Sequence, residues 1–177
     1  IRDLSFDNFK EIIDKVPLTT RIDFSGYTEP FLNKDCGRMI QYAHDKGHTV
    51  SVYTTLVGAN ISDVDLLIDI CKHPTRPFSA HDQENPLAIH LPDEGGVMPV
   101  KITPKYKKIL KYLIHQAQKN NLGLGTNIRF MTMDKNGYLS KEILDVFPLN
   151  KIPFEFKAIS RASNLNDTEV MKQAPSM

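Results

Sequence analysis

Three observations predict an α/β fold with parallel strands for this chain. Helix-like and strand-like patterns alternate strictly along the sequence, and this alternation is typical of parallel sheets covered by helices. The 177 residues are 41% hydrophobic and 24% charged, which suits one globular domain with its own core. The strand-like runs are short and rich in β-branched or apolar residues, whereas the longer runs carry apolar residues at helical spacing.

The first half of the chain contains five expected elements. Ser5 is placed to cap a helix that Pro17 ends, and Ser62 is placed to cap a later one. Between them, Asn33 is expected to cap a helix that Gly47 terminates in the left-handed conformation. The strands expected in this half lie at 20–24 and 49–55.

The second half continues the same alternation. A short apolar run at 87–91 predicts a buried strand, and Thr103 followed by Pro104 is a strong helix start. The remaining expected elements are a strand at 127–133, a short helix at 140–147 and a strand at 154–159, followed by a polar tail beyond Arg161.

Two architectures satisfy this order of elements. One is an open, doubly wound sheet, and the other is an arc of a β/α barrel with its helices on the outside. Both place the functional face at the carboxyl ends of the strands, so the loops that follow the strands are the segments to examine.

Charge and cysteine content exclude several classes of protein. A net charge of +1 argues against a dedicated nucleic-acid binder, which carries a basic excess. No apolar run approaches the ~20 residues that a membrane helix needs, so no membrane partner is expected. The two cysteines, Cys36 and Cys71, are too few for a disulfide scaffold or for a cluster or zinc site built on cysteines alone, and they fit a reducing, cytoplasmic compartment.

The most informative loop runs from Asp23 to Pro30, directly after the first strand. Gly26 there exposes backbone groups, and Glu29 sets one fixed charge at the functional edge. Backbone carbonyls together with Glu29 are suited to holding an ammonium group. A tight connection between strand and helix explains the same composition, and both interpretations stay open at this point.

Several segments resemble the radical S-adenosylmethionine enzymes. The run Phe-Ser-Gly-Tyr-Thr-Glu-Pro-Phe-Leu at 24–32 is similar to the loop after the second strand of that family. Residues 42–55 are similar to its second helix and third strand, although Thr54-Thr55-Leu56 stands where the family reads Thr-Asn-Gly. Residues 87–93 resemble its fourth strand. The run at 159–165 resembles a Ser-Arg-Ala-Gly-Asn segment that precedes the auxiliary-cluster (SPASM) domain in one subgroup.

The resemblance implies a fold and a set of site residues. The fold is a partial β/α barrel with parallel strands and helices on the outside. Glu29 and the backbone of Gly26, Tyr27 and Thr28 would hold the methionine ammonium of S-adenosylmethionine. Thr54, His90 and Asn127 would line the rest of the cofactor cleft. Two of these residues also have purely structural explanations. Thr54 is equally well explained as a β-branched residue that fills space in a strand, and His90 as a hydrogen-bonded histidine of the core.

The chain departs from the family at its defining motif, Cys-x-x-x-Cys-x-x-Cys, which holds a 4Fe–4S cluster. Cys36 falls on the second expected helix and Cys71 at the end of the third, so neither replaces the motif and both are expected to be small core residues. The motif and the first strand are expected upstream of Ile1. The chain would then be a fragment, with the barrel core at 1–160 and a tail or linker at 161–177, that binds no cluster and is inactive by itself.

The function implied for the full-length protein is an oxidoreductase reaction. It would reductively cleave S-adenosylmethionine at the cluster and abstract a hydrogen from an unknown substrate, with peptides or proteins suggested by the 159–165 segment. Flavodoxin or ferredoxin would donate the electron. Two alternatives come from other classes: a degenerate binding or scaffold module without catalysis, and an unrelated open-sheet α/β enzyme in which the Glu29 loop is coincidental.

Overall fold

The computed structural model describes residues 3–26, 28–75, 86–122, 128–133 and 139–146, together with the backbone of 157–158. Its helices are α1 (Phe6–Ile13), α2 (Cys36–Asp45), α3 (Ile61–Lys72) and α4 (Pro104–Lys119), with the 3₁₀ turns η1 (Pro30–Leu32) and η2 (Lys141–Val146). Its strands are β1 (Ile22–Phe24), β2 (Val50–Thr54), β3 (Leu87–His90), β4 (Ile128–Thr132) and β5 (Lys157–Ala158).

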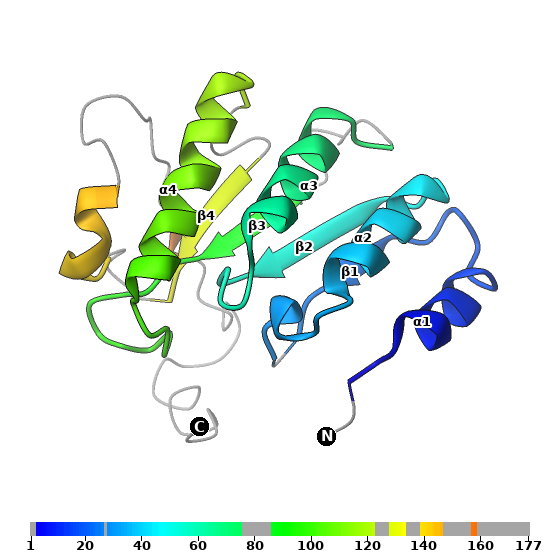
Figure 1. Ribbon diagram of the computed structural model, residues 1–177, viewed down its shortest axis with the longest axis horizontal. Helices are drawn as coiled ribbons and strands as arrows, with labels where there is room; N and C mark the ends of the chain where they lie inside the picture. The colour runs from blue at the N-terminus through cyan, green and yellow to red at the C-terminus, as the bar shows by residue number, and fades with distance from the viewer. Residues whose placement is uncertain are drawn as a thin grey trace.

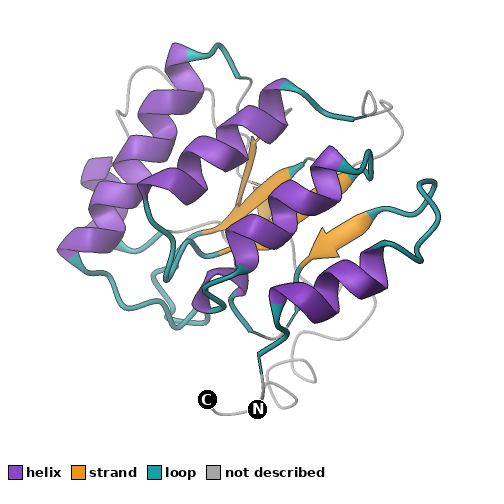
Figure 2. Ribbon diagram, turned by 45° about the vertical axis from the view of Figure 1, so that its right-hand side comes forward, coloured by secondary structure: helices purple, strands orange, loops and turns teal. Residues whose placement is uncertain are grey.

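The strands form one parallel sheet whose spatial order follows the chain, β1-β2-β3-β4-β5. Helices α1 to α4 lie in front of this sheet in Figure 1 and stay on the same side of it in the turned view of Figure 2. A doubly wound sheet reverses its strand order at a switch point, and these strands show no reversal. The edges β1 and β5 do not pair with each other, so the sheet is open in the described part of the chain.

Three of the local signals in the sequence act as expected. The Ser5 side chain accepts a hydrogen bond from the backbone of Asn8 at the start of α1, and Thr103 does the same for Tyr106 at the start of α4. After α2, Gly47 has a φ of +94° and supplies the left-handed terminator. Helix and strand boundaries therefore follow from short-range chemistry at these places.

Two predicted caps are wrong, and the structure gives a separate reason for each. Helix α2 begins at Cys36, because Asn33 instead accepts from the backbone of Asp35 and donates to the Leu4 carbonyl. Helix α3 is capped by Asn60 rather than Ser62, since Asn60 forms a reciprocal capping box with Asp63. The bond between Asn33 and Leu4 joins segments far apart in the sequence, whereas the capping box at Asn60 is local, and residue spacing alone predicts neither.

The core lies between the sheet and the helices. Val50 and Val52 of β2 and Leu87 and Ile89 of β3 face the helices and belong to one apolar cluster with them. The intervening side chains point to the opposite face of the sheet. That second face carries Ser51, Ala88, His90, Arg129 and Met131, of which only Arg129 is more than slightly exposed.

The predicted short helix at 140–147 is a 3₁₀ turn, η2, in the described residues 139–146. The predicted strand at 154–159 is described only as β5, and the resembling segment at 159–165 and the tail at 161–177 lie outside the described residues. The loops after β1, β2 and β3 each lead from the carboxyl end of a strand to the first turn of the next helix. These loops therefore build one edge of the molecule, where the candidate site lies.

Candidate functional site

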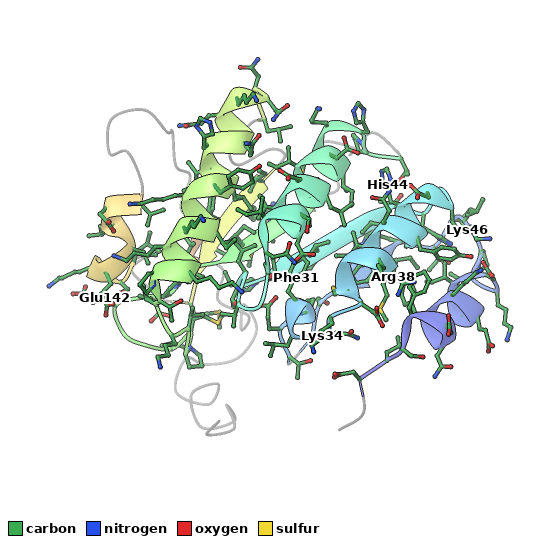
Figure 3. All side chains as sticks on the ribbon, in the orientation of Figure 1. Phe31, Lys34, Arg38, His44, Lys46 and Glu142 are labelled. Atoms are coloured by element: carbon green, nitrogen blue, oxygen red, sulfur yellow. The ribbon has the colours of Figure 1, made fainter. Side chains whose placement is uncertain are left out.

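The carboxylate of Glu29 is the centre of this edge and joins the loops after β1 and β2. Its Oε1 accepts hydrogen bonds from the Phe31 N–H at 3.3 Å and the Thr54 hydroxyl at 2.5 Å. Its Oε2 accepts from the Thr55 N–H at 2.7 Å and the Thr55 hydroxyl at 2.6 Å. These four donors and the carboxylate are called the Glu29 cluster below. Figure 3 labels Phe31 beside the end of β2.

Local sequence explains why Glu29 points this way. Glu29 is the N-cap of the 3₁₀ turn η1, and Pro30 at its first position removes one backbone donor that would need a partner. The Thr54 side chain is 2% exposed at the end of β2, and its hydroxyl oxygen also accepts from the Leu56 N–H at 2.8 Å. The Thr54 hydroxyl thus links the turn after β2 to the carboxylate.

The turn after β2 carries unusual backbone geometry. Leu56 has a φ of +66°, a left-handed conformation that costs a non-glycine residue about 1–2 kcal/mol. Its side chain is 2% exposed, so burial in the core offsets that strain. Glycine is the residue that adopts this conformation without strain, so a leucine here is unusual.

Gly58 brings this turn into close contact with η1. It has a φ of +88°, and a Cβ built there would lie 2.5 Å from the carbonyl oxygen of Phe31. Only glycine allows two backbones to approach so closely. The loops after β1 and β2 therefore touch twice, through Gly58 and Phe31 and through the Glu29 cluster.

The charge of Glu29 acts on groups around it, although the donors that it binds are all neutral. Burial raises the pKa of the Cys36 thiol to about 12, and the charges of Asp63 and Glu29 add to that rise. Burial also raises the pKa of Tyr106, with a further contribution from Glu29. Both side chains therefore stay protonated at neutral pH beside the carboxylate.

The structure describes three of the four residues predicted to hold an ammonium group. Gly26 and Thr28 are exposed, and Glu29 is half-buried, while Tyr27 lies outside the described residues. Gly26 has a φ of +144°, and a Cβ there would meet no atom within 4 Å. Gly26 and Thr28 are therefore open to solvent, whereas the Glu29 carboxylate is held by hydrogen bonds from its own chain.

The residues predicted to line the rest of the cleft do not share one face. Thr54 pairs with Ile89, which faces the helices, so His90 lies on the opposite face of the sheet. His90 is 5% exposed and shares that face with Arg129. Asn127 lies outside the described residues. The structure thus brings Thr54 to Glu29 and leaves His90 on the second face.

The cysteines do not fit the ligands of a 4Fe–4S cluster. Cys36 is 3% and Cys71 is 2% exposed, and burial raises the pKa of the Cys71 thiol, like that of Cys36, to about 12. Cysteines that bind a cluster are thiolates that face one shared site. Cys36 and Cys71 are instead buried, protonated thiols on two different helices. Their prediction as small core residues is confirmed. Within the described ranges, no group of three metal-ligating side chains occurs.

Two polar features at this edge were not predicted from the sequence. Thr55 ends a predicted strand, and the resemblance suggests a hydroxyl near the ribose or the methionine carboxylate there, but its two bonds to Glu29, half of those that the carboxylate accepts, were not predicted. Asp93 is 4% exposed in the loop after β3, and its carboxylate accepts from the backbone of Val97 at 2.9 Å and Met98 at 2.7 Å. An aspartate followed within three residues by a pair of glycines, as in Asp93-Glu94-Gly95-Gly96, is a signal for such a turn.

Comparisons with known proteins add no assignment: no protein-family model, curated protein or solved structure matches the chain. Among the helices of the described residues, none combines the length and apolarity that crossing a bilayer requires.

Proposed function

We propose that this chain forms the S-adenosylmethionine-binding part of a radical S-adenosylmethionine enzyme. The observation that carries the proposal is the Glu29 carboxylate, which is held at the carboxyl edge of a parallel sheet by the loops after two adjacent strands. This is the edge where α/β proteins bind ligands, and Glu29 stands in the segment with the strongest family resemblance.

The sheet supports the barrel form of the proposal. A sequential order of parallel strands, with helices on one face, is what an arc of a β/α barrel has. We therefore propose a partial barrel whose inner surface is the face with Ser51, Ala88, His90 and Arg129. The same strand order disfavours an unrelated doubly wound enzyme, because such a sheet needs a switch point.

The residues present fit the amino-acid end of S-adenosylmethionine. Glu29 would bind its ammonium group, and the exposed backbone at Gly26 and Thr28 leaves room for the approach. When bound, the cofactor supplies a sulfonium for reductive cleavage, whereas this chain binds and orients it. The cluster does not fit Cys36 or Cys71, so no step of its chemistry is assigned to residues of this chain.

The resemblance also supports the wider proposal. It includes a cytoplasmic oxidoreductase, an electron from flavodoxin or ferredoxin, and hydrogen abstraction from a peptide or protein substrate. The described residues contribute the cofactor-binding edge to that reaction, and Thr54 contributes by holding Glu29.

Direct binding tests the proposal. S-adenosylmethionine binding is measured by isothermal titration calorimetry on the 177-residue chain, with Glu29→Gln and the matched control Glu142→Gln. Glu142 is exposed on η2 and lies far from Phe31 in Figure 3. We expect Glu29→Gln to weaken binding about tenfold or more, a loss of about 1.4 kcal/mol, because a neutral amide cannot pair with the ammonium.

Glu142→Gln is expected to bind like the wild type, and thermal unfolding of both variants checks that they are folded. A wild-type chain that does not bind S-adenosylmethionine, or a folded Glu29→Gln variant with unchanged affinity, contradicts the proposal.

A second candidate is a binding or scaffold module without catalysis. It is favoured by the saturation of Glu29, because four internal hydrogen bonds are also what a purely structural staple would show. In that case Glu29→Gln lowers the unfolding temperature, and S-adenosylmethionine does not raise the unfolding temperature of the wild type.

A further inference from the structure

We propose that the Thr55 hydroxyl competes with the ligand for Glu29 and thereby sets the affinity of this site for an ammonium group. The inference rests on the proposed function, since it assumes that Glu29 is the ammonium anchor. It concerns a residue that acts through the anchor rather than one that touches the reacting atoms.

The argument starts from the acceptor capacity of a carboxylate. Two carboxylate oxygens offer about four lone-pair positions, and Glu29 uses four for its own chain. An ammonium is only a donor, so it gains full contact with Glu29 when one of the internal donors moves away. The affinity of the site therefore depends on which donor leaves most easily.

Three of the donors are held in place. The N–H groups of Phe31 and Thr55 belong to the backbone of η1 and of the turn after β2, which are in contact through Gly58. The Thr54 hydroxyl is buried, and its oxygen accepts from the Leu56 N–H at 2.8 Å, so turning it away disturbs a second hydrogen bond.

The Thr55 hydroxyl is the donor that is least restrained. The residue is half-buried, and the other contact of this oxygen is a long one, 3.4 Å from the Val57 N–H. Rotation of the hydroxyl breaks its bond to Oε2 and leaves the Thr55 N–H at 2.7 Å on the same oxygen. Oε2 is thus the atom at which an ammonium replaces an internal donor, while three bonds keep Glu29 in position.

The opposite role would be a supporting one, in which the Thr55 hydroxyl orients Glu29 for the ligand. The two roles predict opposite signs for removal of the hydroxyl. A competitor that is removed strengthens ligand binding, because no charge-assisted hydrogen bond has to be broken first. A support that is removed weakens it.

The experiment compares Thr55→Val, Thr55→Ala and Thr55→Ser with the wild type by calorimetry, using S-adenosylmethionine and 5′-methylthioadenosine as ligands. 5′-Methylthioadenosine lacks the amino-acid part and its ammonium. We expect Thr55→Val and Thr55→Ala to bind S-adenosylmethionine about fivefold more tightly, with 5′-methylthioadenosine unchanged. Thr55→Ser keeps the hydroxyl and restores the wild-type affinity.

Unchanged or weaker binding of S-adenosylmethionine by folded Thr55→Val and Thr55→Ala overturns the inference. A parallel change in the affinity for 5′-methylthioadenosine does so too, since it shows a general effect on the edge. Glu29→Gln separates this failure from failure of the proposed function. If Glu29→Gln loses binding while the Thr55 variants do not gain it, the anchor stands and only the competitor role falls.

Discussion

Glu29 and Asp14 are both carboxylates that bind several donors, but they do so in different surroundings. Glu29 is half-buried at the carboxyl edge and is bound by two N–H groups and two hydroxyls. Asp14 is exposed at the end of α1, where the Tyr42 hydroxyl lies at 2.5 Å and the Lys46 ammonium at 2.7 Å. Figure 3 labels Lys46, which follows the C-terminal end of α2.

The two carboxylates differ in what holds them in position. Asp14 is paired with the exposed lysine Lys46 at the surface, where water and salt screen the attraction and the pair adds little stability. Glu29 is bound by neutral groups of two turns that contact each other through Gly58 and Phe31. Within the described residues, the donors to Glu29 are neutral N–H and O–H groups, so they orient the carboxylate without cancelling its charge. The exposed pair serves to join α1 to α2.

A substitution at Gly58 is expected to give the largest loss of stability among the tests of this comparison. Gly58→Ala adds left-handed strain and a clash with the Phe31 carbonyl oxygen, so we expect about 3 kcal/mol of destabilisation in urea unfolding. Gly47→Ala is the matched control, because Gly47 has a similar φ of +94° but open space around its Cβ. We expect about 1 kcal/mol there. Equal losses for the two variants would show that the contact between the loops is not tight.

Thr54 gives an intermediate effect. Thr54→Val removes the hydrogen bond to Glu29 and deprives the Leu56 N–H of its acceptor, so we expect a loss of about 2 kcal/mol in the free energy of unfolding. Thr55→Val also removes one bond to Glu29, but at a half-buried position and without orphaning a well-bonded N–H, so its loss is expected to be smaller. A larger loss for Thr55→Val would reverse our assignment of the restrained hydroxyl.

Asp14 gives the smallest effect, and it depends on solution conditions. Hydrogen bonds from Lys46 and then Tyr42 lower the pKa of Asp14. Since the folded-state pKa is lowered, its contribution to stability is present above the unfolded pKa of about 3.9 and is lost as the pH falls through the lowered value. Asp14→Asn should therefore lower the unfolding temperature slightly at pH 7 and not at all at strongly acidic pH.

High salt provides the control for that prediction. In 1 M salt, where the Debye length is ~3 Å, the effect of Asp14→Asn should shrink, whereas the loss caused by Thr54→Val should persist. A salt-independent effect of Asp14→Asn would show that the pair is more than a surface contact.

Sequence patterns predicted the elements better than their exact starts. Thr103-Pro104 marks the first turn of α4 because one hydroxyl and one proline meet there without competitors. Asn33 fails as the cap of α2, since its side chain instead holds Leu4 and Asp35, and the bond to Leu4 links distant parts of the chain. A contact across that separation has no local signature.

The candidate site shows the same limit. Gly26, Glu29 and Pro30 drew attention to the first loop because each has a distinct backbone or charge property. Thr55 carried a weaker signal, since a threonine at the end of a strand can equally fill space, and nothing local indicated a bond to Glu29. Its role follows from the pairing of β1 with β2, which brings the two loops together.

By itself, the sequence determined the alternation of helices and strands, the parallel sheet and the buried state of Cys36 and Cys71. These follow from hydrophobic periodicity and composition, which act along the chain. Only the tertiary structure decided that the strands lie in sequential order, that His90 and Thr54 occupy opposite faces, and that four donors converge on Glu29. Those properties depend on the register between strands, and register is set by packing between segments that lie far apart in the sequence.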